Sequence, residues 1–206
     1  MTKRLSINIT KIIFSIFIIF VTLWQYRTKW EWWFEFTFIS SIVMSCVILI
    51  DGIINIANKR LFVPSIIYEL LMPCMFANFC TIIAAIFIDW VNFKWPYIFL
   101  HIVNPLFAMA TYIFTTKVKI KSKFDYWLRI LLSPIALLIY GLFDVIRFIH
   151  TGFYMYGLMP KSWPVSLTML LGTAIIMVLG ILITWGLLQV NLTINKMLNM
   201  KNQKQK

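Results

Sequence analysis

KVKIKSK at residues 117–123 separates two long apolar segments, residues 95–116 and 126–150. Each segment is long enough to cross the hydrocarbon core of a bilayer, which takes about 20 helical residues. The heptapeptide alternates lysine with valine, isoleucine and serine, and closely spaced charges of this kind are costly inside lipid. The stretch therefore predicts a solvated turn between two membrane-spanning helices.

Outward from this turn, the rest of the chain repeats the pattern of apolar segments and short polar connections. The six apolar segments are residues 6–26, 34–57, 64–89, 95–116, 126–150 and 165–195. They account for most of the 206 residues, of which 61% are hydrophobic, so no room remains for a soluble domain. We predict an all-α integral membrane protein, in which residues 1–206 form a single domain of six transmembrane helices in one bundle.

Basic residues are distributed unevenly among the connections. The N-terminus (with Lys11 included), the second and fourth connections and the C-terminal tail contain thirteen of the nineteen lysines and arginines. The other three connections contain four, and Arg129 and Arg147 lie inside segments. Cytoplasmic loops of membrane proteins are enriched in lysine and arginine. The distribution therefore predicts a multi-pass protein of the cell membrane with both termini in the cytoplasm.

The formal net charge of +12 indicates which class of binding partner to expect. In a soluble protein this charge would favour nucleic acid, but here most of it flanks membrane segments. Membrane lipids with anionic headgroups are therefore the expected partners and nucleic acid is not, although control of topology alone also explains the charge. Cys46, Cys74 and Cys80 lie within segments and lack the spacing of a metal site or a disulfide framework. We expect neither a metal nor a cofactor.

Polar residues inside the inner half of the apolar segments are the first functional candidates, because ionisable groups are costly in lipid. Asp51 and Arg129 lie near helix ends, where they are expected to reach lipid headgroups. Glu69 lies deeper, one turn before Pro73. Pro73 and Pro134 are expected to kink their helices, either for packing or to open a small polar cavity.

The outer half of the segments contains a larger polar set. Asp144 and Arg147 are three residues apart on one helix, so they share a face and can form an ion pair. That pair has two interpretations: it fixes the outer end of the bundle, or Arg147 orients an anionic headgroup or carboxylate. The full outer set is Glu35, Thr37, His101, Asn104, Asp144, Arg147 and His150.

Thr37 and His101 stand at similar depths near the start of the second and fourth segments. A histidine in a membrane segment is usually a hydrogen-bonded packing residue, and a threonine that opens a helix is usually a cap or a back-bonded hydroxyl. By themselves, the two residues leave both structural and catalytic roles open.

Four short stretches follow one another in an order that resembles a known family. FTFISS at residues 36–41, HIVNP at 101–105, PIALLIY at 134–140 and GFYMY at 152–156 are similar to motifs of the Pr6Pr-like membrane proteins, which are related to the FAR-17a/AIG1-like group. In the family, an arginine–glycine pair follows the tyrosine of the fifth helix. Near that position this chain has Asp144 and Arg147, without a glycine.

The resemblance implies a six-helix fold and a threonine-dependent hydrolase of lipid esters, such as fatty acid esters of hydroxy fatty acids. Thr37 would be the nucleophile and His101 its base, with Asp144 as a candidate to orient the histidine. The residues expected to bind substrate are Asn104, Tyr140, Asp144 and Arg147.

Two alternatives to the hydrolase remain open. In a non-enzymatic module, such as a transport component or an interaction scaffold, Glu69, Pro73, Asp144 and Arg147 would line a path and Thr37 and His101 would not meet. The other alternative is a purely structural bundle held by ion pairs.

Overall fold

The structure is a computed structural model of the chain, and it describes residues 2–28, 35–57, 63–87, 94–152 and 165–203. Within these ranges the chain is helical and contains no strand, which confirms the predicted all-α fold. The elements are α1 (Thr2–Tyr26), α2 (Phe36–Ala57), α3 (Ser65–Phe87), α4 (Trp95–Ile98), the π-helix η2 (Phe99–Val103), α5 (Asn104–Thr115), α6 (Lys123–Leu132), α7 (Ile135–Thr151) and α8 (Val165–Gln203).

Five helical stretches among the described residues are long and apolar enough to cross a membrane, and a sixth, Ser65–Cys80, is apolar but shorter. The predicted segments correspond to these five to six helices. The five longer stretches are Leu5–Tyr26, Phe36–Ala57, Trp95–Thr115, Lys123–Thr151 and Met177–Met197.

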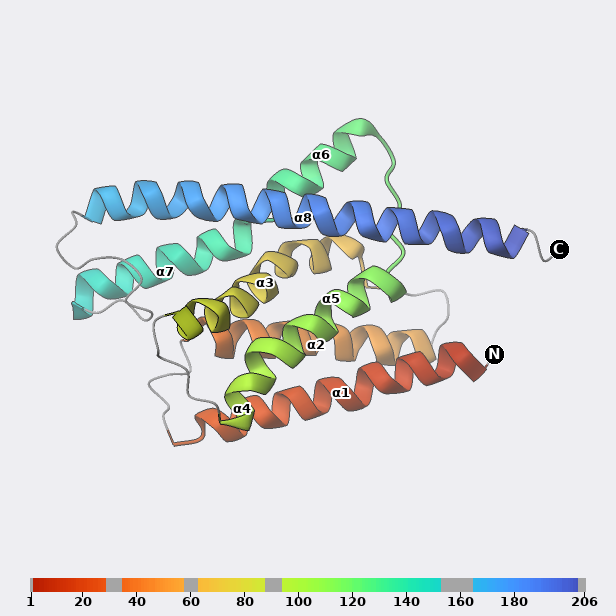
Figure 1. The fold of residues 1–206 in the computed structure, drawn as a ribbon, viewed down its shortest axis with the longest axis horizontal. Helices are drawn as coiled ribbons and strands as arrows, with labels where there is room; N and C mark the ends of the chain where they lie inside the picture. The colour runs from red at the N-terminus through yellow and green to blue at the C-terminus, as the bar shows by residue number, and fades with distance from the viewer. Residues whose placement is uncertain (1, 29–34, 58–62, 88–93, 153–164, 204–206) are drawn as a thin grey trace.

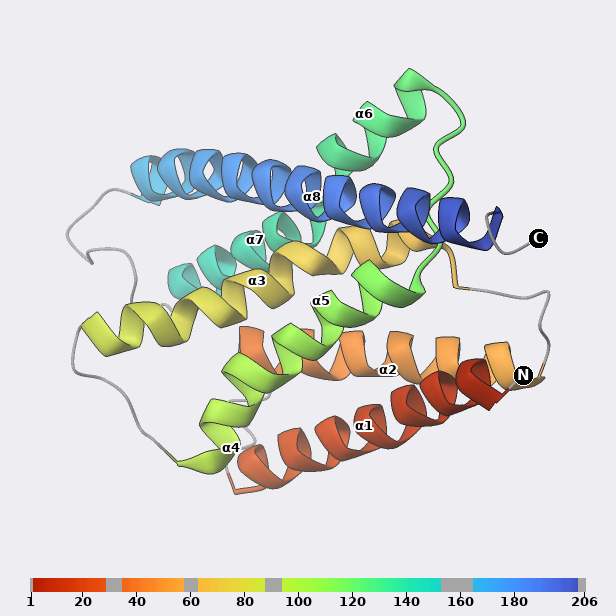
Figure 2. The same cartoon turned by 45° about the vertical axis from the view of Figure 1, so that its right-hand side comes forward.

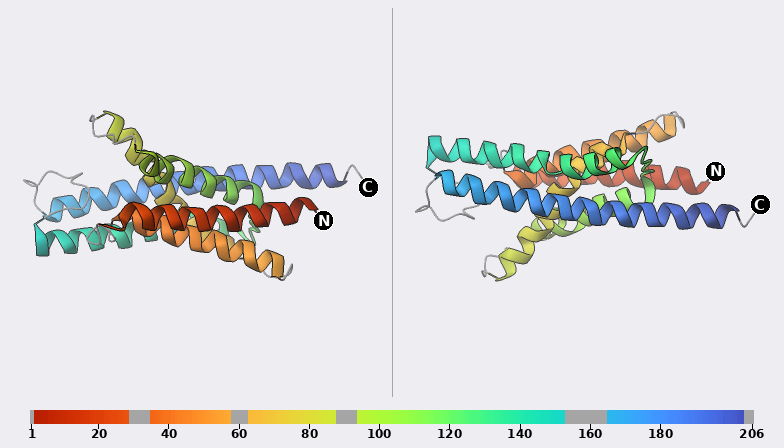
Figure 3. Two further views of the ribbon diagram at one scale, coloured as in Figure 1. Left: turned by 90° about the horizontal axis from the view of Figure 1, so that it is seen from below. Right: turned by 90° about the horizontal axis from the view of Figure 1, so that it is seen from above.

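The helices form an elongated bundle with α1 and α2 packed against each other along one side (Figure 1). The long helix α8 runs along the opposite side next to α7, and α3 and α5 fill the middle (Figure 2). The N-terminal end of α1 and the C-terminal end of α8 lie at the same end of the bundle (Figure 1). Helix α3 contains Pro73 in its interior. Its C-terminal end leans away from the bundle (Figure 3).

The surface and the interior have the polarity expected of a protein in lipid. Large apolar side chains of α1 face outward, with Ile13 62% and Phe20 57% exposed. On the inner side of the same helix, Lys11, Ser15 and Thr22 are buried. Because lipid tails are as apolar as leucine, helices in a membrane associate through packing and polar contacts of this kind.

Pro134 interrupts the fifth predicted segment. Helix α6 ends at Leu132 and α7 begins at Ile135, because proline lacks an N–H group and its ring clashes with the preceding turn. The Ser133 hydroxyl donates to the Ile130 carbonyl at 2.8 Å and to the Gly180 carbonyl of α8 at 3.2 Å. The predicted kink is thus a full break, and α8 packs directly against it.

Gly180 allows this close approach, and adding a methyl group there should destabilise the bundle. A Cβ atom on Gly180 would lie 2.7 Å from Cβ of Pro134, whereas a Cβ atom on Gly186 of the same helix meets nothing within 4 Å. We expect Gly180→Ala to lower the free energy of unfolding by about 1–3 kcal/mol through overpacking. Unfolding in mixed detergent micelles measures this loss.

The matched control is Gly186→Ala, which should leave stability unchanged or raise it, because alanine favours a helix over glycine by up to about 1 kcal/mol. Equal effects of the two substitutions would contradict a specific contact at Gly180.

Residues 116–122, between α5 and α6, are not the fully solvated turn that the sequence predicted. Val118 is buried and Ile120 packs against the main apolar core, whereas Lys117, Lys119 and Lys121 are exposed. In an extended chain, alternate side chains point to opposite sides. The alternation of this stretch therefore anchors it to the bundle and places three lysines together on its other side.

Asp51, expected to reach lipid headgroups, is instead turned into the bundle. Lys11, counted above with the N-terminal basic residues, is 4% exposed within α1, and its Nζ lies 2.6 Å from Oδ2 of Asp51. Asp51 is buried as well, and it also accepts hydrogen bonds from Tyr68 at 3.1 Å and Asn55 at 2.8 Å. A buried charge requires a partner, and Lys11 provides it for Asp51 inside the bundle.

Arg129 is likewise turned inward. Its Nη1 lies 3.0 Å from both carboxylate oxygens of Glu69 and 2.8 Å from the Ser65 hydroxyl, and its Nε lies 2.9 Å from Asp125. Tyr112 donates to the same Glu69 carboxylate at 3.3 Å. The Glu69 side chain is 1% exposed. Its partner Arg129 reaches it from α6.

Candidate functional site

The site begins with a polar stripe at the start of α2. Thr37, Ser40, Ser41 and Ser45 are all buried, at spacings of three and four residues. Residues with these spacings lie on one face of a helix, so the stripe faces the interior of the bundle. The same FTFISS stretch that resembles the family motif therefore supplies three hydroxyl groups to the interior.

Asn78 of α3 connects this stripe to the middle of the bundle. The Thr37 hydroxyl donates to Oδ1 of Asn78 at 3.3 Å, and Nδ2 of Asn78 donates to the Ser40 hydroxyl at 2.8 Å. Ser40 in turn donates to the Phe36 carbonyl at 2.5 Å. Thr37 and Asn78 are both fully buried. The threonine hydroxyl is thus held in a defined orientation by a neighbouring helix.

The backbone of Asn78 also orients His101. Nδ1 of His101 lies 3.0 Å from the Asn78 carbonyl oxygen, and the histidine is 3% exposed. A carbonyl can only accept, so Nδ1 carries the proton and Nε2 carries the lone pair in the neutral ring. This is the tautomer that a general base needs. The Asn78 carbonyl makes the contact with Nδ1 that the sequence suggested for Asp144.

His101 lies in the five-residue π-helix η2, which joins α4 to α5. The N–H of Asn104 donates to the Phe99 carbonyl, five residues earlier, and Pro105 follows with no N–H group to give. A proline ring clashes with the carbonyl four residues before it, here that of His101, and a widened turn relieves the clash. The HIVNP stretch thus dictates the local π-geometry, a feature that is frequent at functional sites.

Asn104, expected to bind substrate, lies in the same buried layer. Its Nδ2 donates to the Ser41 hydroxyl at 2.9 Å, which connects α5 to the stripe on α2 in addition to the contacts made by Asn78 of α3. Its Oδ1 is buried and has no hydrogen-bond partner among the described residues. A buried acceptor without a partner costs free energy, so Asn104 retains the capacity to accept a hydrogen bond from a bound group.

The other three expected substrate-binding residues come from α7. The ring of Tyr140 lies 4.8 Å from that of Phe36, next to Thr37 in the sequence. Asp144 and Arg147, with Glu35, are close enough to act electrostatically on the Tyr140 hydroxyl. All three α7 residues are half-buried. They form a second polar group at the start of α2, near the Thr37–Asn78–His101 cluster.

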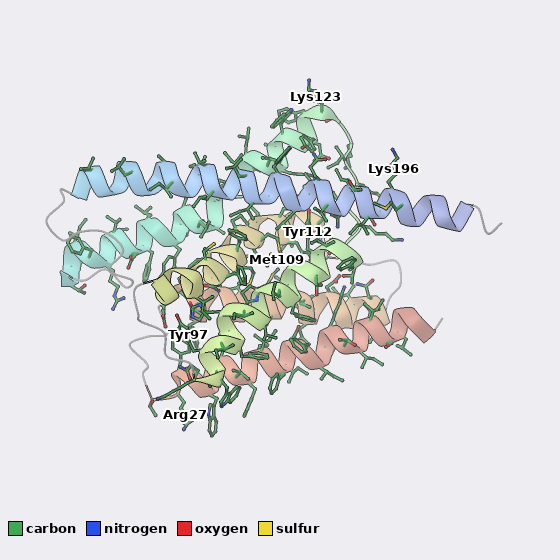
Figure 4. All side chains as sticks on the ribbon, viewed as in Figure 1. Arg27, Tyr97, Met109, Tyr112, Lys123 and Lys196 are labelled. Atoms are coloured by element: carbon green, nitrogen blue, oxygen red, sulfur yellow. The ribbon has the colours of Figure 1, made fainter. Side chains whose placement is uncertain are left out.

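Some site residues were missed by the sequence reasoning, and others lie outside the described ranges. Asn78 is the residue that touches both Thr37 and His101, and its only signal was a single amide in the apolar segment 64–89. Tyr97, whose ring lies 4.3 Å from that of His101, was missed too (labelled in Figure 4). Of the GFYMY stretch, residues 153–156 lie outside the described residues.

The cluster contains groups that are capable of acid–base chemistry. The three cysteines are free thiols, and the described residues contain no group of three or more histidine, cysteine, aspartate or glutamate side chains that could hold a metal ion. A hydroxyl, a neutral imidazole and an amide on three different helices are instead the components of a nucleophilic site. Compared with known protein families, curated proteins and solved structures, the chain matches none of them.

Proposed function

We propose that this protein is a six-helix, multi-pass membrane protein that hydrolyses a lipid ester, with Thr37 as nucleophile, His101 as base and both termini in the cytoplasm. The observation that carries the proposal is the position of Asn78, which binds the Thr37 hydroxyl through its side chain and the His101 ring through its carbonyl. Residues 37 and 101, far apart in the sequence, thus share one neighbour. The resemblance to Pr6Pr-like proteins supports the same pair.

The proposed reaction proceeds through an acyl-enzyme. The Thr37 oxygen attacks the ester carbonyl carbon while its proton passes to Nε2 of His101, and the imidazolium then returns that proton to the leaving alcohol. Water, activated by the same nitrogen, releases the fatty acid. Arg147 or a backbone N–H at the start of α2 would stabilise the oxyanion, a contribution of about 3–4 kcal/mol for one donor.

The proposal requires a route by which the ester reaches the buried hydroxyl of Thr37. Thr37 has no exposed surface, so the ester has to displace side chains that cover it. Tyr140 is only half-buried and packs on Phe36, which makes the side facing α7 the proposed entrance. Asp144 and Arg147 would line this entrance and hold the polar part of the substrate.

A fluorophosphonate lipid probe tests the nucleophile on the purified full-length protein. We expect covalent labelling of the wild type, its retention in Thr37→Ser, which keeps a hydroxyl, and its loss in Thr37→Ala and His101→Ala. Loss of an activated nucleophile or its base typically lowers the rate by factors of about 10³ or more. Mass spectrometry of the labelled peptide identifies the modified residue.

Two matched variants control for folding. Thr22→Ala removes another fully buried threonine, whose hydroxyl bonds to the Ile18 carbonyl of its own helix, and His150→Ala removes an exposed histidine. Both should be labelled as well as the wild type. Absence of labelling in the wild type, or labelling that survives in Thr37→Ala, would contradict the hydrolase and favour the non-enzymatic module.

A further inference from the structure

A cavity of about 670 Å³ opens at the end of the bundle remote from Thr37. Asp51 lines it, and Asp51 lies fourteen residues after Thr37 on α2, a separation of about 21 Å along a helix. The walls come from α1, the C-terminal end of α2, the start of α3, the end of α5, residues 116–122 and α6. Its volume is in the range of small-molecule sites, which run from about 300 to 1,000 Å³.

The charge of this cavity is strongly positive. Five of its lining residues are basic and one, Asp51, is acidic. Lys11 is neutralised by Asp51, and Arg129 by Glu69 and Asp125. The remaining three basic residues are Lys117, Lys119 and Lys121, none of which makes a salt bridge with any residue that the structure describes.

The three lysines reach the cavity together because of the alternation in KVKIKSK. Val118 and Ile120 pack into the apolar core from the opposite side of the extended segment. The backbone N–H of Lys121 donates to the Asp125 carboxylate at 2.9 Å, which fixes the end of the segment. The cations are therefore held next to each other at a cost in mutual repulsion that a bound anion would relieve.

Thr116 also borders the cavity, but its 8% exposed side chain lies on the same side of the extended segment as Val118 and Ile120, opposite the lysines, and its Oγ1 is enclosed. The other part of the lining is apolar and includes Ile7 and Phe114, of which Phe114 is 65% exposed.

We propose that this cavity binds a phosphomonoester group, held by Lys117, Lys119 and Lys121. A phosphomonoester carries up to two negative charges and several acceptor oxygens, which match a set of ammonium donors. The volume exceeds that of a phosphate group alone and leaves room for a glycerol-sized substituent against Ile7 and Phe114. The group belongs either to an anionic lipid headgroup or to a soluble phosphate ester.

Calorimetric titration of the purified full-length protein in neutral detergent tests the site. The probes are dioctanoyl phosphatidic acid, glycerol 3-phosphate and, as an uncharged comparison, dioctanoylglycerol. We expect phosphatidic acid to bind more tightly than dioctanoylglycerol, which as a lipid ester can still reach the Thr37 site but has no phosphate group for the lysines. Binding of glycerol 3-phosphate with similar affinity would identify a soluble phosphate ester as sufficient, whereas binding of phosphatidic acid alone would identify the lipid headgroup. If neither phosphate probe binds, the proposal is wrong.

Charge-matched double variants distinguish binding in this cavity from general electrostatic attraction to the protein surface. Lys117→Gln/Lys119→Gln should weaken binding of phosphatidic acid by about tenfold or more, because each lost contact is a charge-assisted hydrogen bond. Lys123→Gln/Lys196→Gln removes the same charge from exposed lysines that do not line the cavity and point away from the bundle (Figure 4). Equal weakening in the two double variants would overturn the proposal.

Unchanged binding in Lys117→Gln/Lys119→Gln would place any bound phosphate outside this cavity. Thr37→Ala should bind phosphatidic acid as the wild type does, since Thr37 lies far along α2.

Discussion

Replacing Asp51 with alanine is expected to lower the free energy of unfolding by about 3–5 kcal/mol, the usual cost of removing one partner of a buried ion pair. The substitution leaves the Lys11 ammonium, which is 5% exposed, without a counter-charge inside the bundle. It also removes the acceptor for Tyr68 and Asn55. Titration with a denaturing detergent in mixed micelles, followed by circular dichroism, measures the loss.

The double variant Lys11→Met/Asp51→Ala distinguishes an unpaired charge from general loss of packing. Replacing both members of a buried ion pair by apolar groups is often nearly neutral. We therefore expect the double variant to recover most of the stability that Asp51→Ala loses. A double variant as unstable as the single one, or an Asp51→Ala loss below about 1 kcal/mol, would show that the pair contributes little.

Arg129→Ala should have a comparable effect, because it leaves the Glu69 carboxylate buried and without its cation. Glu69 is 1% exposed and receives bonds from Arg129 and Tyr112, and without Arg129 its remaining donors are uncharged hydroxyl groups. We expect a loss of about 3–5 kcal/mol in the same unfolding experiment. The double variant Glu69→Gln/Arg129→Met should regain most of it.

Asp125→Asn is the matched control for Arg129→Ala, because Asp125 is a second carboxylate that binds Arg129 and it lies in a more exposed environment. The side chain of Asp125 is 23% exposed and forms an i, i+4 pair with Arg129 on α6. Such solvent-exposed pairs contribute little to stability, so Asp125→Asn should cost far less than Arg129→Ala. If Asp125→Asn is as damaging as Arg129→Ala, the stabilising contact is at the surface and not at Glu69.

The all-α fold with several long apolar helices could be predicted from the sequence, because the relevant signals are local. An apolar run of more than about 20 residues has to satisfy its own backbone hydrogen bonds in lipid, and a helix does so without partners. The helices α2 and α5 end within two residues of the predicted segments 34–57 and 95–116. The break at Pro134 also follows from one residue type, because proline cannot continue a helix.

The polar contacts between helices could not be predicted, because they depend on how the helices rotate and cross. Lys11 was counted only as one of the basic residues of the N-terminus, yet α1 turns it toward Asp51. Arg129 was expected at the headgroups, yet α6 crosses α3 where Glu69 lies. In each case an ionisable side chain had a partner forty or sixty residues away, which no local pattern specifies.

For the candidate site, the sequence determined which chemical groups are present and the tertiary structure determined which of them meet. FTFISS and HIVNP place Thr37 and His101 on helix faces, and Pro105 imposes the wide turn around His101, because these effects act within one or two turns. Only the packing of α3 between α2 and η2 brings Asn78 to both residues and selects the histidine tautomer. The same division holds for KVKIKSK: its alternation sets which side the lysines share, and the neighbouring helix ends make that side a cavity.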